Sequence, residues 1–461
     1  MKKIFITISR GAIARNLLKN DFFLVLRDKV KIVILATAAD DMRFRNEFKH
    51  PNVSFVRFAE KEHTLGDRFL FFFHKNLIYN GTVEEKNRWG VIGDSRSYQP
   101  NYVSFLVKKI IFVPLSRVRF LRGFARLLDF LFLQKSEVAE FQELIRREKP
   151  DLVISTNIAA DTESALLKAT RKEHIRSIGI AKSWDNLSKH SFRAQADTIV
   201  VWSKFMASEA VHFQNYAIKD IRIIGIPQFD RYVLKDKLLS RQEFCKMMGL
   251  DANRRIILFG SEGSLFQSDA EIASIISENI LRNDIIPPSQ LLIRPHYGYK
   301  ADDLKFKDLQ NKPNVVIDRF NNPSPEFRDR WDYSEEFSDR FMNCLYHSDV
   351  VVSSFSTLTL DAVAFNKPII NVSFDGKESK PYRESIARWG ASTYFGAILK
   401  TNAICDVKNS QDLIRAINEY LKDPSNREVE REKLLKDFCL VIDGRSGKRF
   451  ARVVLEETGL L

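Results

Sequence analysis

Three short segments of the chain combine small residues with side chains that can bind phosphate. In chain order they are Gly260-Ser261-Glu262-Gly263-Ser264, Arg294-Pro295-His296 and Ser353-Ser354-Phe355-Ser356-Thr357. Each segment directly follows an apolar run of strand length. Small residues let a phosphate approach the backbone, and the side chains of Arg294 and His296 can donate hydrogen bonds to its oxygens. The three segments therefore predict a site for the phosphates of a nucleotide or nucleotide sugar.

The Ser/Thr-rich segment lies where a strand should end and a helix through Asp361 to Phe365 should begin. Free backbone N–H groups and the positive end of a helix bind anions there. The residues that we predict to contact the donor are Gly260, Ser261, Gly263, Ser264, Arg294, Ser353, Ser354, Ser356, Thr357 and Asp361, the last near the hydroxyls of the nucleotide. Ordinary helix capping and tight turns are the alternatives, because Ser, Thr and Gly favour both.

A second polar set occurs in the first half of the chain. The segment Lys182–His190, KSWDNLSKH, follows an apolar run that ends at Ala181. Trp184 can stack on a sugar face, and we predict Asp185 as a general base, since a carboxylate near apolar surface tends to have a raised pKa. An Asx-type helix cap is the alternative. The residues predicted to bind an acceptor are Trp184 and Asn186, with Arg10, Gly11, Arg15 and Asn16 after the first apolar run.

The elements that must hold these residues form a regular series. Short apolar runs alternate with longer helical patterns, which is the rhythm of a parallel α/β sheet. The runs are Ile4–Ile8, Lys31–Ala36, Val53–Phe58, Leu152–Ser155, Ile178–Ala181, Thr198–Trp202 and Ile221–Gly225, then Ile256–Phe259, Leu291–Ile293, Val315–Ile317, Val350–Val352 and Ile369–Val372. Because ligands in such sheets bind beyond the strands' carboxyl ends, the polar segments should face one cleft.

These runs divide the chain of 461 residues into two α/β domains. We expect the first domain over residues 1–230, with a mostly helical, basic insertion at about 60–148, and a polar connector over 231–254. The second domain should cover residues 255–425, and helices over 426–461 should cross back to the first domain. The four cysteines lack paired spacing, which argues against a disulfide framework and a zinc site.

The net charge of +13 calls for a partner. Residues 68–77 and 108–128 are rich in Phe, Lys and Arg, and such basic, aromatic segments suit an anionic membrane surface. The alternative is two core-facing helices with solvated basic edges. No nucleic-acid motif accompanies the charge, so we expect no nucleic-acid partner. No signal peptide and no apolar run of bilayer length is predicted, which favours a cytoplasmic location, peripheral at the inner face of the membrane.

Four stretches resemble the GT-B glycosyltransferase superfamily, near the CDP-glycerol glycerophosphotransferases and the UDP-N-acetylglucosamine 2-epimerases. They are Gly225-Ile226-Pro227-Gln228-Phe229-Asp230, which is similar to a Gly-x-Pro-x-x-Asp motif, Arg294-Pro295-His296, the stretch from Ser348 to Ile370, and SWDNLSKH with Val200–Ser203. The last stretch looks like predicted surface-polysaccharide transferases. The resemblance implies two Rossmann-like domains facing a central cleft, with a nucleotide-activated donor held mainly by the second and an acceptor by the first.

The resemblance further implies catalysis without a metal or other cofactor, and the chain contains no Asp-x-Asp sequence. We expect a glycosyltransferase of cell-envelope polysaccharide biosynthesis that moves a sugar from a UDP, CDP, GDP or CMP donor to a glycan or lipid-linked acceptor. Asp185 and His296 are its predicted catalytic residues. A CDP-glycerol-type polyol-phosphate transferase is the first alternative. A 2-epimerase is disfavoured by the Gly-poor Ser353–Thr357 segment, and a non-catalytic membrane-binding protein is the fourth possibility considered.

Overall fold

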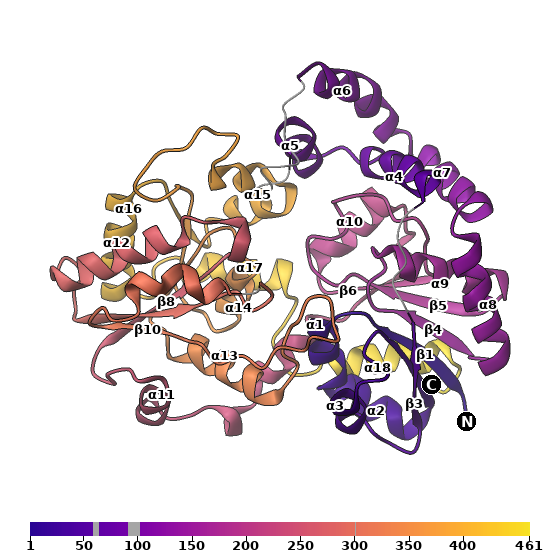
Figure 1. Ribbon diagram of the computed structural model, residues 1–461, viewed down its shortest axis with the longest axis horizontal. Helices are drawn as coiled ribbons and strands as arrows, with labels where there is room; N and C mark the ends of the chain where they lie inside the picture. The colour runs from indigo at the N-terminus through magenta and orange to yellow at the C-terminus, as the bar shows by residue number, and fades with distance from the viewer. Residues whose placement is uncertain (59–63, 91–101, 300) are drawn as a thin grey trace.

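Two parallel β-sheets, each flanked by helices, make up the computed structural model, which describes residues 1–58, 64–90, 102–299 and 301–461 (Figure 1). The first sheet has the order β3-β2-β1-β4-β5-β6-β7. Its strands are β1 Lys3–Ile8, β2 Lys31–Ala36, β3 Val53–Arg57, β4 Leu152–Ser155, β5 Arg176–Ile180, β6 Thr198–Val201 and β7 Ile221–Ile223. This architecture confirms the prediction of two Rossmann-like domains.

The second sheet has the order β10-β9-β8-β11-β12-β13, and all its pairs are parallel. Its strands are β8 Arg255–Gly260, β9 Ser289–Arg294, β10 Val315–Ile317, β11 Val350–Ser353, β12 Ile369–Val372 and β13 Cys405–Val407. Only β13 was not predicted. Its three residues are polar in the middle, and only Val407 is buried, so they give no apolar run.

Both faces of the first sheet are buried. Ile4, Ile6 and Ile8 pack into one hydrophobic cluster, whereas Phe5, between them, belongs to a cluster on the other face. The flanking helices of this domain are α1 Gly11–Ile13, a π-helix Ala14–Leu18, α2 Asp21–Lys29, α3 Met42–Glu47, α9 Asp161–Lys172, α10 Lys204–Gln214 and the 3-10 helices Ile218–Asp220 and Pro227–Val233.

The second domain has a similar set of helices around its sheet. They are α11 Arg241–Met248, α12 Asp269–Leu281, α13 Glu335–His347, α14 Leu358–Ala364, α15 Thr393–Leu399, α16 Ser410–Lys422 and the 3-10 helices Lys235–Lys237, Gly263–Leu265, Asp302–Leu309 and Ile386–Ala391. Its hydrophobic core continues into the first domain through Trp184, Phe192 and Trp202. The four cysteines are free thiols.

Among the described residues between β3 and β4, five helices occur: α4 Leu65–Asn76, α5 Gly81–Trp89, α6 Tyr102–Arg117, α7 Arg119–Phe132 and α8 Lys135–Glu148. They correspond to the insertion predicted at about 60–148, of which residues 60–63 and 91–101 lie outside the described residues. In Figure 1, α4, α6 and α7 form the upper edge of the molecule beyond the first sheet. None of the described helices is long and apolar enough to cross a membrane.

The chain ends with α17 Glu428–Phe438 and α18 Ser446–Glu457, and α18 packs against α2 of the first domain. The rings of Phe22 and Phe450 stack there at 4.2 Å. The carboxylate of Asp230 accepts hydrogen bonds from the backbone N–H groups of Ser446 and Gly447, at 2.9 and 2.6 Å. The Asp of the Gly-x-Pro-x-x-Asp motif therefore fixes the first turn of the crossing helix.

A loop between β10 and α13 makes the reverse connection from the second domain to the first. Its Phe327 and Tyr333 are buried in the first domain's core, where their rings meet Phe44 edge-on. The carboxylate of Asp329 accepts hydrogen bonds from the backbone N–H groups of Gly11 and Ala12, at 2.9 and 3.2 Å. The two domains are thus joined by the crossing helix α18 and by this loop.

Candidate active site

A cavity of about 650 Å³ opens between the two domains and is lined by residues from both. Its wall contains twelve of the predicted site residues: Arg15, Asn16, Trp184, Asp185, Gly260, Ser261, Arg294, His296, Ser354, Ser356, Thr357 and Asp361. This size suits a nucleotide-sized ligand. The cavity is therefore the candidate active site.

The three predicted phosphate segments end neighbouring strands. Gly260 is paired in register with Arg294 on β9 and with Ser353 on β11. The last residues of β9, β8 and β11 thus form one row across the carboxyl edge of the sheet, where ligands bind in open α/β folds. An added Cβ on Gly260 would lie 2.3 Å from Leu358 Cδ2, so a glycine lets the first turn of α14 come close to the strand.

The loop before α14 contains a buried hydroxyl with no hydrogen-bond partner among the described residues. Ser354 is fully buried, lines the cavity, and has no hydrogen-bond partner for its Oγ among the described residues. Phe355 adopts a left-handed backbone (φ 51°), and its N–H donates to Asn371 Oδ1 at 2.7 Å. Ser356 Oγ accepts from the N–H of Leu358 at 3.2 Å, whereas Thr357 makes no side-chain cap. Ordinary helix capping therefore accounts in part for a serine at position 356. It does not account for the buried, unpartnered hydroxyl of Ser354.

Two guanidinium groups line the cavity, those of Arg294 and Arg15, and they differ in whether a carboxylate pairs with them. Arg294 Nη1 donates to Asp318 at 2.7 Å, so a carboxylate already balances its charge. Arg15, within the π-helix, donates to Asn16 Oδ1 and packs over the ring of Trp331 at 5.2 Å. No ion pair of Arg15 with a carboxylate occurs within the described part of the chain. Arg15 is therefore the better placed of the two to bind an incoming anion.

His296 lines the cavity with its imidazole between Tyr299 and Trp331, at ring distances of 4.7 and 5.4 Å. Its backbone N–H donates to Asp302 at 2.7 Å, which fixes the segment. The Nδ1 atom is buried and has no partner among the described residues. Burial lowers the pKa of His296 below its ordinary value, so the ring is neutral at pH 7 and has a lone pair available.

Asp361, on α14, has one carboxylate oxygen occupied. Tyr232, from the 3-10 helix that ends the first domain, donates its hydroxyl to Asp361 Oδ1 at 2.5 Å. Burial raises the pKa of Asp361 to about 6, although Tyr232 and the charges of Arg15 and Arg294 oppose this rise. The contact joins the two domains at the cavity wall, and no local pattern in the sequence pairs these two residues.

The structure corrects the prediction about the pKa of Asp185. Burial alone would raise this pKa, but the ion pair with Lys189 and hydrogen bonding from Ser183 lower it below its ordinary value. Trp184 also differs from the expectation, because only 2% of its surface is exposed and its ring is enclosed by Tyr394, Phe395 and Phe438. It supports the wall and offers no open face for stacking on a sugar.

Several predicted residues do not line the cavity: Arg10, Gly11, Asn186, Gly263, Ser264 and Ser353. The N–H of Gly11 is bound by Asp329, and an added Cβ there would lie 2.4 Å from the carbonyl oxygen of Trp331. Asn186 Oδ1 accepts from the N–H of Ser183, three residues earlier, at 3.1 Å, so its side chain holds a local turn and caps no helix. Ser264 is exposed, and Ser353 is buried within β11.

Glu262 was not predicted as a site residue, although it lies within the Gly260–Ser264 segment. It lines the cavity, and its Oε1 is buried without a hydrogen-bond partner among the described residues. Burial, with a smaller contribution from the nearby Asp269, raises its pKa to about 8, although hydrogen bonding with Ser356 opposes this rise. Glu262 thus carries a proton at pH 7 and can donate a hydrogen bond. The sequence feature that could have identified Glu262 is an acidic residue among small residues at the end of an apolar strand.

The fold and the row of strand ends define a two-domain, Rossmann-like protein with a ligand site in its central cleft. A family model described as CDP-glycerol:poly(glycerophosphate) glycerophosphotransferase matches residues 170–456. Because this match covers more than half of the chain, the chain belongs to that family, which is a family of transferases. No curated protein sequence matches the chain.

Solved structures share the fold at low sequence identity. A UDP-GlcNAc 2-epimerase from Methanocaldococcus jannaschii superimposes with a TM-score of 0.56 at 12% identity, covering 99% of this chain and 100% of that one. A UDP-GlcNAc 2-epimerase from Neisseria meningitidis, bound to UDP-GlcNAc, gives 0.52 at 10% identity with the same coverage. A glycosyltransferase from Rickettsia africae gives 0.50 at 12% identity, covering 100% and 98%. At such identities the likeness shows the fold alone.

Proposed function

We propose that this chain transfers a polyol phosphate from a CDP-activated donor to a glycan or lipid-linked acceptor in the synthesis of a cell-surface polymer. One observation carries the proposal: the row Arg294, Gly260 and Ser353 ends three strands at a cavity that both domains line. The family match favours a polyol phosphate over the sugar that the sequence resemblance first suggested.

The donor is proposed to bind against the second domain. Its phosphates meet the buried hydroxyl of Ser354, the hydroxyls of Ser356 and Thr357, and the guanidinium of Arg15. The protonated carboxyl of Glu262 adds a donor that does not repel an anion. These groups stabilise the charge that develops on the leaving nucleotide, and we propose that the step needs no metal ion or organic cofactor.

His296 is proposed as the general base. In the transfer, the acceptor hydroxyl forms a new P–O bond to the donor's β-phosphorus, and the bond from that phosphorus to the bridging oxygen breaks. The leaving product is CMP, and the hydroxyl proton passes to the neutral imidazole of His296, which lines the cavity. Asp185 is less suited to this role, because its ion pair with Lys189 lowers its basicity.

The acceptor is proposed to approach from the first domain, where Lys189, Asp185 and Asn16 line the cavity. Lys189 pairs with Asp185, so the two side chains form a neutral, hydrogen-bonding wall that suits hydroxyl-rich or phosphorylated chains. We place the reaction on the cytoplasmic side of a membrane, where activated nucleotides are made and a lipid-linked acceptor is anchored.

Transfer of a sugar is the second candidate. The aromatic rings of Trp331, Trp389 and Tyr394 line the cavity, and such rings stack on sugar faces as well as on nucleotide bases. A glycosyl transfer from a nucleotide sugar breaks the bond between the sugar carbon and the phosphate oxygen. It therefore releases a nucleoside diphosphate, whereas transfer of a polyol phosphate releases a nucleoside monophosphate.

The identity of the released nucleotide distinguishes the candidates. A thermal-shift panel of CDP, UDP, GDP and CMP with their sugars and polyols selects the donor, because a ligand that binds only the folded state raises its stability. The donor is then incubated with a cell-surface acceptor, with and without EDTA. We expect CMP to accumulate only with acceptor and equally in both conditions. CDP or UDP would favour sugar transfer, and a new sugar nucleotide without acceptor would indicate an epimerase.

A further inference from the structure

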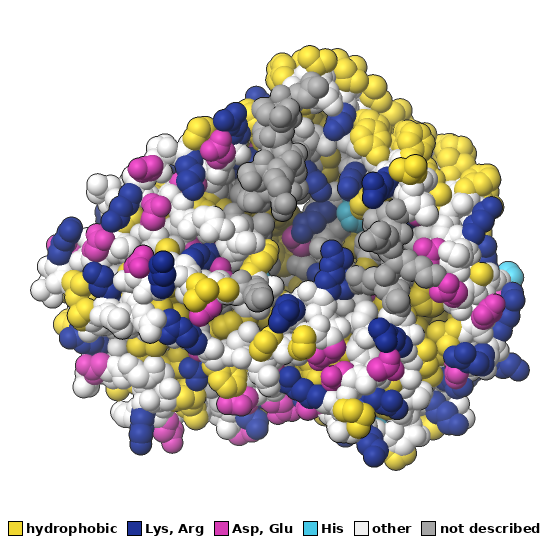
Figure 2. Space-filling view, in the orientation of Figure 1, with side chains coloured by type: hydrophobic (Ala, Val, Ile, Leu, Met, Phe, Trp, Pro, Cys, Tyr) yellow, Lys and Arg dark blue, Asp and Glu magenta, His cyan; other side chains and the backbone are white. Residues whose placement is uncertain are grey.

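Two lysines of this basic chain are largely withdrawn from solvent. Figure 2 shows lysine and arginine side chains spread over one face of the molecule, whereas only 1% of the Lys168 side chain and 13% of the Lys305 side chain are exposed. A buried ammonium group is costly unless carboxylates or other acceptors compensate its charge. The partners of these two lysines therefore show what each charge holds in place.

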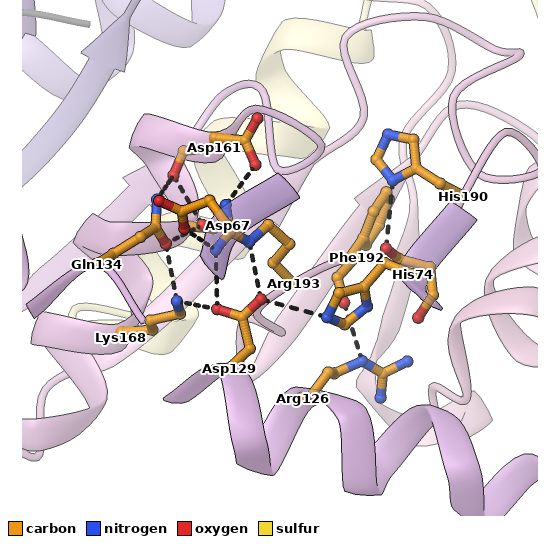
Figure 3. A network of polar contacts seen from close by, with 12 residues as sticks. Asp67, His74, Arg126, Asp129, Gln134, Asp161, Lys168, His190, Phe192 and Arg193 are labelled. Carbon is orange, nitrogen blue, oxygen red and sulfur yellow. Dashed lines mark hydrogen bonds and ion pairs between the residues drawn. The ribbon is translucent and has the colours of Figure 1, made fainter. Parts of the chain in front are cut away.

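Lys168 belongs to an ionic network within the first domain (Figure 3). It pairs with Asp129 of α7, and Arg193 donates to the same carboxylate at 2.8 Å. Arg193 also donates to Asp67 of α4 at 2.7 Å and to Asp161 of α9 at 2.9 Å. None of these five residues lines the cavity. This network joins three helices, and its charges serve the fold.

Lys305 has partners on two loops that reach the cavity. It lies in the 3-10 helix that follows β9, and its ammonium group donates to the carbonyl oxygens of Gly263 and Phe266 at 2.7 and 3.2 Å. The same group pairs with Asp269, the first residue of α12, at 2.8 Å and with Asp302 at 3.0 Å. Gly263 and Phe266 belong to the loop between β8 and α12. One cation thus connects the loop after β8 to the loop after β9.

Asp269 extends this connection to Glu262. Its Oδ2 accepts hydrogen bonds from the backbone N–H of Glu262 and the hydroxyl of Ser261, both at 2.8 Å, in addition to the one from Lys305. Asp269 is fully buried, and Ser261 and Glu262 line the cavity. The backbone that places the Glu262 side chain is therefore fixed by a carboxylate whose charge Lys305 balances.

Asp302 extends the connection to His296. One of its oxygens, Oδ1, pairs with Lys305, and the other, Oδ2, accepts from the backbone N–H of His296 at 2.7 Å. Neither Asp302 nor Lys305 lines the cavity, whereas His296 does. We call Lys305, Asp269 and Asp302 the Lys305 network; it reaches the site only through the backbone of the residues that line it.

We propose that Lys305 is a positioning residue of the candidate active site, which fixes the spacing between the imidazole of His296 and the carboxyl of Glu262 by connecting the two loops that carry them. The roles of His296 as the base and of Glu262 as a donor to phosphate rest on the proposed function. The connection between the loops is independent of it. A base displaced by about 1 Å can lower a rate by about 100-fold, so a fixed spacing favours transfer.

The charges of the Lys305 network act on His296 in opposite directions. Burial lowers the pKa of His296 most, the carboxylate of Asp302 raises it, and the ammonium group of Lys305 lowers it. Tyr299 and Trp331, whose rings pack against the imidazole, are uncharged at pH 7. Loss of the Lys305 charge should therefore raise the pKa of His296, and loss of the Asp302 charge should lower it.

The network is tested without any substrate, by NMR titration of the full chain labelled with isotopic histidine. The variant His296→Gln identifies the signal of His296 among the eight histidines. Lys305→Gln should raise the pKa of His296 and Asp302→Asn should lower it, because asparagine still accepts the N–H of His296 but carries no charge. Lys307→Gln is the matched control, since Lys307 is an exposed lysine of the same helix.

The sign of the two shifts decides the outcome. A rise of the His296 pKa in both variants would mean that the imidazole has only become exposed to water, and would overturn the proposal. An unchanged pKa in both would do the same. Lys305→Gln leaves two buried carboxylates without their cation, so circular dichroism checks that it is folded. If it is unfolded, Asp302→Asn, in which Lys305 keeps Asp269 as a partner, decides alone by the direction of its shift.

The consequence for the reaction is measured with CDP and CDP-glycerol. Lys305→Gln should weaken the binding of CDP by about tenfold, as for one lost hydrogen bond to phosphate, and lower turnover by roughly 10- to 100-fold. Lys307→Gln should change neither. Parent-like binding and turnover in folded Lys305→Gln would overturn the positioning role. If the parent uses no donor while the two pKa shifts have opposite signs, the proposed function fails and the connection between the loops stands.

Discussion

The hydroxyl of Tyr232 donates a hydrogen bond to Asp361 Oδ1 at 2.5 Å and joins the first domain to helix α14 of the second at the cavity wall. Asp361 is buried and Tyr232 is half-buried, and loss of water around them raises the pKa of both groups. The contact places the end of the first domain at the cavity wall, beside the proposed donor site.

Replacing Tyr232 with Phe should lower the free energy of unfolding by about 1–3 kcal/mol, because the Asp361 carboxyl loses its donor while it stays buried. Chemical denaturation of the purified variant measures this loss. Tyr346→Phe is the control, since Tyr346 is 44% exposed. If Tyr232→Phe is as stable as the parent, the contact does not hold the domains together.

Arg15→Ala should weaken binding of the donor nucleotide by about 1.5–3 kcal/mol, or roughly 10- to 150-fold in Kd, as expected for a lost charge-assisted hydrogen bond to phosphate. Isothermal titration with CDP measures the change. Arg282→Ala, at an exposed position after α12, should bind like the parent. An unchanged Kd for Arg15→Ala would place the phosphates elsewhere.

Glu262 gives a pH dependence with a defined sign. Burial raises its pKa to about 8 from an ordinary value of 4.5, so between these pH values the folded state holds a proton that the unfolded chain releases. Stability from this group is complete below about pH 4.5 and falls as the pH rises toward 8, by at most about 1.4 kcal/mol per pH unit. Glu262→Gln should lack this decline in denaturation experiments from pH 5 to 8.

The exposed Glu432→Gln is the matched control for this series. Its stability should follow that of the parent across the whole pH range. If Glu262→Gln shows the same pH slope as the parent, the carboxyl of Glu262 is ionised in the folded protein and does not serve as a hydrogen-bond donor to phosphate.

Asp129→Asn should lower the free energy of unfolding by about 3–5 kcal/mol, because Arg193 and Lys168 keep their charges in a buried network that has lost its central anion. Denaturant titration measures the loss. Asp308→Asn, at an exposed position, should have little effect. A loss below about 1 kcal/mol for Asp129→Asn would show that the network does not fix α7 to the domain.

The sequence predicted the strands well, because each central strand of a parallel sheet is a short apolar run between helical patterns. It also predicted the row formed by Arg294, Gly260 and Ser353, since residues that follow parallel strands share one edge. The sequence pattern could not predict contacts between distant segments. Two examples are the hydrogen bonds of Tyr232 with Asp361 and of Gly11 with Asp329. Both depend on how the two domains are placed, which a local pattern does not encode.

Other differences have local physical causes. The pKa of Asp185 is lowered because Lys189, four residues further along the chain, pairs with it, whereas the strand-end position alone suggested a raised pKa. The apolar periodicity of α7 correctly indicated a helix. The periodicity did not show which way the apolar side of α7 faces, because such a side can pack on the core or be exposed to an external apolar partner. The buried hydrogen bonds of Arg122 and Arg126 show that the polar side of α7 faces the domain and the apolar side faces outward.

The role of His296 is the most direct test of the proposed reaction. Release of CMP from CDP-glycerol in the presence of acceptor is compared between the parent and His296→Gln, together with the Kd for CDP. We predict a loss in turnover of about 10²–10⁴-fold, as expected for a general base, with a Kd changed by less than about threefold. Unchanged turnover in His296→Gln would contradict the account of the cleft between the two domains as the catalytic site.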